Sequence, residues 1–180
     1  MRTNSLFDKA ESHWSCPACS RRKTEIGCLD RQGNMLYAIV SHHDHLRNFA
    51  PDYFREHLGT NWNTILHRRC PDAGLFIDRI QAFTVGFRHV RICQPCNHIE
   101  RQARSNVKAP KYFSFSSRAM RSFIDVDRQR QAHFVPDAVA ATYEKLIPEF
   151  KIRLRVATRF TRDLHSGRYW HDYSLPCWQS

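Results

Sequence analysis

Cys93-Gln94-Pro95-Cys96 repeats the spacing of an earlier motif in the chain, Cys16-Pro17-Ala18-Cys19. A Cys-x-x-Cys turn places two sulfur atoms on one side of a tight knuckle, and two such knuckles supply the four thiolates of a tetrahedral Zn²⁺ site. A redox dithiol is the other common use of the motif, but it usually stands beside a βαβ pattern, which this sequence lacks. We therefore predict a structural zinc ion bound by Cys16, Cys19, Cys93 and Cys96.

A second group of potential ligands, His42-His43-Asp44-His45, lies between the two knuckles and directly follows an apolar sequence. Because side chains alternate along an extended backbone, His42 and Asp44 are expected on one face and His43 and His45 on the other. One face could bind a divalent cation while a histidine on the other activates water. The amide oxygen of Asn97, directly after the second knuckle, could complete the cation site.

Turn and apolar patterns predict a hairpin before this cluster, with strands over 24–29 and 35–40 joined by turn residues 30–34. Further expected elements are helices over 48–58 and 97–104, strands over 83–87 and 89–92, a helix from Ser117, and a helix from Pro136 that Pro148 kinks or splits. The aromatic residues Tyr112, Phe113 and Phe115 lie between these elements. They could stack on bases, but a hydrophobic latch onto the core is the favoured interpretation.

Composition points to a polyanionic partner. The formal net charge is +11 and the sequence pI is about 9.7, which favours nucleic acid, and both 1–104 and 105–180 carry net positive charge. No apolar run approaches the roughly 20 residues of a membrane span, so no membrane partner is expected. The polar N-terminal sequence lacks a signal-peptide core, and the seven cysteines form an odd set with four in knuckles. These features predict a reducing, cytoplasmic location, in the nucleoid or in a phage-infected cell.

The combination resembles the HNH (His-Me finger, ββα-metal) nuclease superfamily, and within it the zinc-anchored branch of phage recombination endonucleases VII. In that branch a Cys-x-x-Cys knuckle precedes a strand ending in an Asp-His-Asp-His run, and a Cys-x-x-Cys-Asn segment opens the last helix. The matching pieces here are the knuckle at 16–19, the run at 42–45 and the segment Val90–Asn97. The resemblance covers roughly residues 14–104.

The resemblance implies an α+β fold, with a zinc-anchored ββα-metal core and a mainly helical C-terminal extension. By position, His42 and Asn97 would bind a catalytic Mg²⁺ or Mn²⁺, and His43 would be the general base. His45 could orient water or contact phosphate. A second register stays open, in which Asp44 is the ligand and His45 is the base.

The implied function is hydrolysis of DNA phosphodiester bonds by a nuclease core over 1–104. A basic region over 105–180 would select substrate or mediate dimerisation. Arg91, Arg101 and Arg104 adjoin the second knuckle and are the expected contacts to the DNA backbone. The alternatives are a non-catalytic zinc module that binds nucleic acid and a nuclease subunit activated by a protein partner; a homodimer is also left open.

Overall fold

The computed structural model describes residues 2–29, 32–127, 129 and 131–168. It contains helices and small sheets, so the predicted α+β class is confirmed. The chain forms two compact units, each built from two stretches of sequence. Unit 1 comprises the residues up to Asp44 together with Phe87–Pro148, and unit 2 comprises His45–Gly86 together with the chain from Glu149 onward. This division differs from the boundary that we expected at residue 104.

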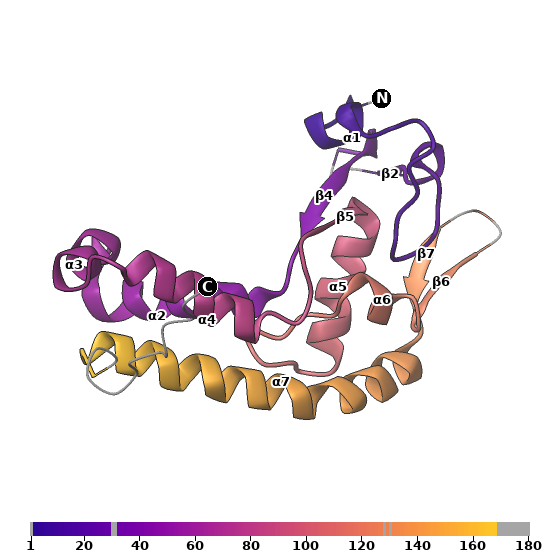
Figure 1. The fold of residues 1–180 in the computed structure, drawn as a ribbon. Coiled ribbons are helices and arrows are strands. Elements are labelled where there is room, and N and C mark those ends of the chain that lie inside the picture. The colour runs from indigo at the N-terminus through magenta and orange to yellow at the C-terminus, as the bar shows by residue number, and fades with distance from the viewer. Residues whose placement is uncertain (1, 30–31, 128, 130, 169–180) are drawn as a thin grey trace, which may run out of the picture. The chain divides into compact units, whose positions relative to one another are not determined.

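Three short strands form the first sheet of unit 1: β1 (Arg2–Thr3), β2 (Cys28–Leu29) and β3 (Met35–Tyr37) (Figure 1). Their order is β1-β3-β2, with β1 parallel and β2 antiparallel to β3. Helix α1 (Ser5–Lys9) and the 3-10 helix η1 (Lys23–Glu25) lie between β1 and β2. The predicted hairpin therefore exists in a shortened form. Part of its expected turn, residues 30 and 31, lies outside the described residues.

The second strand pair places the histidine run. β4 (Ile39–His42) and β5 (Val90–Cys93) pair antiparallel, so that Ile39 lies opposite Cys93 and His42 lies opposite Val90. Both strands contain β-branched residues, which suit a half-buried pleated surface. The predicted strand over 35–40 is thus wrong in one respect, because its two halves belong to different sheets.

Helix α5 (Gln94–Asn106) follows β5 directly (Figure 1). It begins three residues earlier than predicted, because a proline in the first turn costs no intrahelical hydrogen bond there. The buried side chains of α5 are Cys96, Ile99, Glu100 and Ala103, at the spacing of one helical face. The order strand, strand, helix therefore presents Cys93 and Cys96 at the junction of β5 and α5.

The segment after α5 packs aromatic side chains into the core of unit 1. Phe113 and Phe115 are buried, and their rings meet edge to face at 4.9 Å, so the latch interpretation is confirmed. Helix α6 (Ser117–Met120) is capped by the hydroxyl of Ser116, and it is shorter than the predicted helix. The chain then forms an antiparallel pair, β6 (Ile124–Val126) and β7 (Ala132–Phe134).

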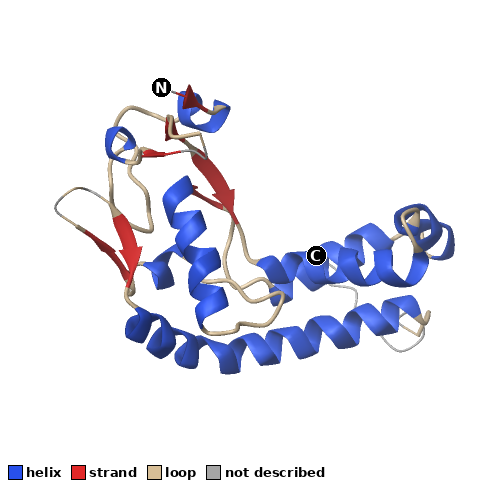
Figure 2. Ribbon diagram, turned by 180° about the vertical axis from the view of Figure 1, so that it is seen from behind, coloured by secondary structure: helices blue, strands red, loops and turns tan. Residues whose placement is uncertain are grey.

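Unit 2 is built from helices and loops in the part of the chain that the structure describes (Figure 2). Its helices are η2 (His45–Asn48), α2 (Phe49–Leu58), α3 (Trp62–Arg69), α4 (Ala73–Thr84) and the C-terminal half of α7 (Pro136–His165). Phe54, Leu66 and Leu164 are among the buried residues of its core. The helix predicted over 48–58 is confirmed, whereas the strand predicted over 83–87 is wrong because α4 continues to Thr84.

Helix α7 belongs to both units and is not split at Pro148. The proline occupies the point where the chain passes from unit 1 to unit 2. Among the described residues, no helix is both long and apolar enough to cross a membrane.

Candidate metal centre and histidine cluster

The two knuckles meet in unit 1. One ligand atom from each of Cys16, Cys19, Cys93 and Cys96 lies within 4.8 Å of all the others. The sulfur atoms of Cys16 and Cys96 are 3.8 Å apart, as are those of Cys19 and Cys93. Zn–S bonds of about 2.3 Å in a tetrahedron require sulfur separations of about 3.8 Å. The four cysteines can therefore hold a metal ion such as zinc.

Local backbone contacts hold the first knuckle in shape. The Ser20 amide donates to the Cys16 carbonyl at 2.8 Å, and the Cys16 amide donates to the Arg21 carbonyl at 2.9 Å. The second knuckle is fixed by secondary structure, because Cys93 ends β5 and Cys96 lies in the first turn of α5. The Cys93 amide also donates to the sulfur of Cys16 at 3.4 Å. Each knuckle is thus shaped by its own backbone, and the two meet through their sulfurs.

Hydrogen bonds among the four thiols couple their protonation. Hydrogen bonding with Cys16 lowers the pKa of Cys19, whereas hydrogen bonds with Cys16, Cys19 and Cys93 and then burial raise the pKa of Cys96. Four neighbouring thiolates would repel one another, so the cluster retains protons until a cation binds. Metal binding must release these protons, which makes its affinity increase with pH.

Arg21 is a buried cation beside the sulfur cluster, and it is not among the site residues predicted from the sequence. Its side chain is 3% exposed, and it donates to the sulfur of Cys19 at 3.3 Å and to that of Cys93 at 3.6 Å. Burial opposes its charge, but the hydrogen bond and the attraction of Cys19 outweigh burial and raise the pKa of Arg21. Since Zn²⁺ with four thiolate ligands has a net charge of about −2, this guanidinium would compensate part of that charge. The sequence shows that Arg21 follows a ligand cysteine by two residues, but Arg22 and Lys23 stand beside it and nothing in the run predicts which side chain is buried.

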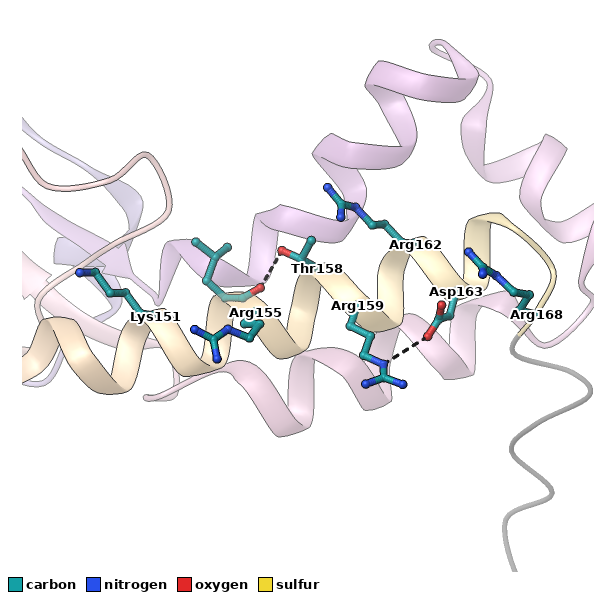
Figure 3. Close-up of a pocket in the computed structure, with 8 residues that line it drawn as sticks. Lys151, Arg155, Thr158, Arg159, Arg162, Asp163 and Arg168 are labelled. Atoms are coloured by element: carbon teal, nitrogen blue, oxygen red, sulfur yellow. Dashed lines mark hydrogen bonds and ion pairs between the residues drawn. The ribbon is translucent and has the colours of Figure 1, made fainter.

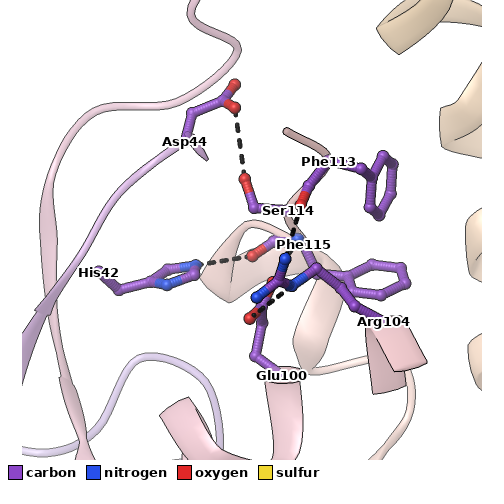
Figure 4. Close-up of polar contacts among 7 residues, drawn as sticks. All are labelled: His42, Asp44, Glu100, Arg104, Phe113, Ser114 and Phe115. Atoms are coloured by element: carbon purple, nitrogen blue, oxygen red, sulfur yellow. Dashed lines mark hydrogen bonds and ion pairs between the residues drawn. The ribbon is translucent and has the colours of Figure 1, made fainter. Parts of the chain in front are cut away.

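His42 and Asp44 face the segment 113–115, as Figure 4 shows. The Nε2 atom of His42 lies 2.7 Å from the Phe115 carbonyl oxygen. A carbonyl oxygen can only accept, so Nε2 carries the proton and Nδ1 presents its lone pair. The Ser114 hydroxyl donates to a carboxylate oxygen of Asp44 at 3.3 Å. The predicted alternation therefore holds for His42 and Asp44, which share one face.

His42 is held as a neutral imidazole. Its side chain is 2% exposed, and its ring stacks on Phe87 with centroids 5.3 Å apart. Burial is the largest effect and lowers the pKa of His42, although the Phe115 carbonyl and Asp44 oppose that shift. A neutral imidazole whose other nitrogen donates to a carbonyl is the form in which histidine ligates metals.

His43 lies among different neighbours from His42. Its ring stacks on that of His89, with centroids 5.0 Å apart and planes inclined by 15°. His89 lies in turn within 3.3 Å of the Ser41 hydroxyl through Nδ1. His43 is half-buried and His89 is exposed, so this side of β4 is more accessible than the side of His42 and Asp44.

The remaining predicted ligand and base positions fall on helices. Asn97 is half-buried near the start of α5, and His45 is the first residue of η2 and belongs to unit 2. Within the described residues, the four cysteines are the group in which three or more His, Cys, Asp or Glu side chains converge. A cation bound by His42 and Asp44 would therefore take its other ligands from Asn97, water or a phosphate.

Arg104 differs from the other two predicted DNA contacts. Its side chain is 21% exposed and its Nε lies 2.9 Å from a carboxylate oxygen of Glu100. Arg91 and Arg101 are exposed, and Arg101 lies within 3.0 Å of Nδ1 of His98. Arg101, Arg104 and Lys108 line a surface cavity of about 410 Å³. Three cationic side chains thus line one surface cavity, and the charge of Arg104 among them is paired with Glu100.

Glu100 supports the segment that contacts His42, and it is not among the residues predicted from the sequence. Its side chain is 2% exposed, and it accepts the Phe115 amide at 3.3 Å as well as pairing with Arg104 (Figure 4). Arg104 also donates to the Phe113 carbonyl at 3.5 Å. The ion pair therefore fixes residues 113–115 against α5, and through them the imidazole of His42.

Replacing Glu100 with glutamine is expected to flatten the pH dependence of stability. Burial raises the pKa of Glu100 above its ordinary 4.5. Because the pKa of Glu100 is higher in the folded protein than in the unfolded chain, the protonated carboxyl favours folding. Its contribution to the free energy of unfolding is therefore complete below pH 4.5 and is lost as pH rises through the folded-state pKa. Urea unfolding at a series of pH values measures the effect. The exposed Glu11→Gln control should keep the wild-type slope, and an unchanged slope in Glu100→Gln would contradict the prediction.

The sequence and the described structure were also compared with known proteins. Models of protein families, curated proteins and solved structures gave no match. Function is therefore inferred from the residues of unit 1 and unit 2 and from their geometry.

Proposed function

We propose that unit 1 is a zinc-anchored nuclease centre of the His-Me finger type that hydrolyses DNA phosphodiester bonds with a divalent cation. The observation that carries the proposal is the antiparallel pair β4–β5 followed by α5, with η2 and α2–α4 inserted between the two strands. His42 ends β4, Cys93 ends β5, and Cys96 and Asn97 lie in the first turn of α5. This order is the one that the resemblance implies for a ββα-metal core. The cysteine cluster ties the first knuckle to the same junction.

The donor types suit a hard or borderline cation. On the buried face His42 offers an unprotonated Nδ1 and Asp44 a carboxylate, and the half-buried Asn97 in the first turn of α5 carries an amide oxygen. When bound, Mg²⁺ or Mn²⁺ supplies charge stabilisation for the scissile phosphate and the leaving 3′ oxygen. Segment 113–115 orients His42 and Asp44 before substrate arrives, so little reorganisation is needed.

His43 acts as the general base in this proposal. Its imidazole accepts a proton from water as the water oxygen forms a bond to phosphorus. The bond between phosphorus and the 3′ oxygen then breaks, and that oxygen takes a proton from solvent. The products are a 5′-phosphate and a 3′-hydroxyl. Arg91, Arg101 and Lys108 supply the positive surface that holds the backbone near α5.

A nuclease activated by a protein partner would be favoured by an extensive apolar face on residues 136–156. In that range of the described structure, Ile152 is the large apolar side chain that lies exposed, at 60%. The apolar surface is therefore small, and catalysis by the protein itself is the simpler proposal.

The proposal is tested by incubating the protein with supercoiled plasmid in buffer free of divalent cations and then adding Mg²⁺ or Mn²⁺. Nicking or linearisation is expected after addition of the cation and not before. Zinc content is measured in parallel, so that loss of the cysteine-bound ion is not mistaken for loss of the catalytic one. Salt-sensitive DNA binding without cleavage under either cation would instead identify a non-catalytic binding module.

A further inference from the structure

The C-terminal half of α7 carries a basic groove in unit 2, remote in sequence from the histidine run (Figure 3). The groove is open to solvent and has a volume of about 540 Å³. Its lining includes one acidic residue, Asp163, and five cations: Lys151, Arg155, Arg159, Arg162 and Arg168. All five cationic residues are exposed. We call these five side chains the α7 basic face.

The spacing of the cations makes the α7 basic face a line. Four of them recur every three or four residues along α7, so they project from one side of the helix. At about 1.5 Å of rise per residue, neighbouring charges are about 6 Å apart along the axis and Lys151 and Arg162 about 16 Å apart. One phosphate group cannot occupy such a length, whereas a run of backbone phosphates can.

The charge of the α7 basic face is poorly compensated within the groove. Asp163 lies 3.8 Å from Arg159, as the dashed line in Figure 3 marks, and it is the acidic residue among those that line the groove. Like charges one helical turn apart repel each other. Bound phosphates would relieve this repulsion and release counterions, and both effects favour binding.

A nucleic acid suits this face better than an anionic membrane. A helix that lies on a membrane inserts a broad apolar face among the lipids. The opposite side of α7 is occupied, because Ala157 and Leu164 are buried within the protein. Within the groove itself, Leu154 is the one large apolar lining residue.

We propose that the α7 basic face binds the phosphate backbone of duplex DNA, as a second contact surface in addition to the cations near α5. The proposal rests on the proposed function for its choice of DNA, and it deepens that function by naming where unit 2 holds the substrate. Contacts of this type are insensitive to base sequence, so they increase affinity rather than specificity.

The test replaces Arg155, Arg159 and Arg162 together with glutamine, which keeps helix propensity and removes three charges. Fluorescence anisotropy with a labelled duplex, in the absence of divalent cations, measures binding without cleavage. If all three residues contact phosphates, the slope of log K against log salt falls by about 2.7, and affinity falls at least about tenfold at moderate salt.

The matched control removes the same charge elsewhere, at the exposed residues Arg79, Arg118 and Lys145. This variant is expected to keep most of the wild-type slope. Equal slopes and affinities for the groove variant and wild type would overturn the proposal, as would groove-dependent binding to phosphatidylserine vesicles with DNA binding unchanged.

Because DNA binding is measured without divalent cations, the experiment distinguishes failure of the α7 basic face proposal from failure of the nuclease proposal. Loss of affinity in the groove variant of a protein that never cleaves DNA would support the α7 basic face and contradict the nuclease. Divalent-cation-dependent cleavage by wild type, together with unchanged DNA binding by the groove variant, would support the nuclease and contradict the α7 basic face proposal. Circular dichroism confirms that both variants remain folded.

Discussion

Replacing Cys96 with serine is expected to abolish stoichiometric zinc binding and to unfold unit 1. Cys96 is fully buried in the first turn of α5 and shares the cluster with three other sulfurs. Structural zinc contributes about 10–16 kcal/mol at neutral pH, whereas a domain is stable by about 5–15 kcal/mol. The free energy lost with the ion is therefore larger than the stability that the small sheets of unit 1 can supply without it. Metal analysis and thermal unfolding followed by circular dichroism measure the two effects.

Cys28→Ser is the matched control for this substitution. Cys28 lies in β2 outside the cluster and is half-buried, so the same chemical change there removes no ligand. The control should bind one zinc ion and melt as the wild type does. A Cys96→Ser protein that kept one zinc ion and the wild-type melting temperature would refute a structural role for the cluster.

Replacing His43 with alanine is expected to reduce DNA cleavage by about 10²–10⁴-fold, the usual contribution of a general base. Zinc content, thermal stability and DNA affinity should remain near wild type, because His43 is half-buried, is not one of the four clustered cysteines, and stacks on the exposed ring of His89. Rates are measured on plasmid DNA at saturating Mg²⁺. Retention of DNA binding separates a catalytic effect from a general loss of structure.

Two further variants complete this experiment. His45→Ala tests the second register, in which Asp44 binds the cation and His45 is the base. Loss of cleavage in His45→Ala together with full activity in His43→Ala would identify His45, and not His43, as the general base. His13→Ala, whose side chain is 82% exposed and pairs with Glu11, controls for the removal of a surface imidazole.

Sequence spacing predicted the cysteine cluster because a metal imposes its own geometry on its ligands. The knuckle shape is local, and any fold that uses both knuckles must bring Cys16 near Cys96. The helix after the second knuckle was predicted from the composition of residues 97–104, and α5 covers them. Alternation along a strand similarly placed His42 and Asp44 together at the end of β4.

Other elements depended on partners that periodicity cannot identify. Residues 35–40 look like one apolar strand, yet Tyr37 pairs with β1 and Ile39 with β5. Residues 83–87 have strand propensity, but Thr84 ends a helix and bonds the Ile80 carbonyl through its hydroxyl. In both cases tertiary packing outweighed local preference.

Three groups around the sites were also beyond prediction from sequence. Glu100 and Arg104 look like an exposed pair at i and i+4, and their burial depends on segment 113–115 packing over α5. Arg21 was one of several basic residues, and its contact with the cysteine sulfurs appears after both knuckles are in place. The burial and the partners of these charged side chains depend on segments distant in the sequence, so they are known once the tertiary structure is known.

The cysteine cluster also sets an order of events during synthesis. Cys16 and Cys96 are 80 residues apart, so at about 5–20 residues per second the first knuckle is made roughly 4–16 s before the last ligand. During that interval the thiols of the first knuckle have no partner knuckle and are open to oxidants. The interval is longer for unit 2, because its contact between Tyr53 and His165 joins residues that are 112 positions apart and cannot form until His165 has been synthesised. Because Cys96 precedes His165 in the chain, all four cysteines are made before the second core can be completed, and Zn²⁺ can bind them at that stage.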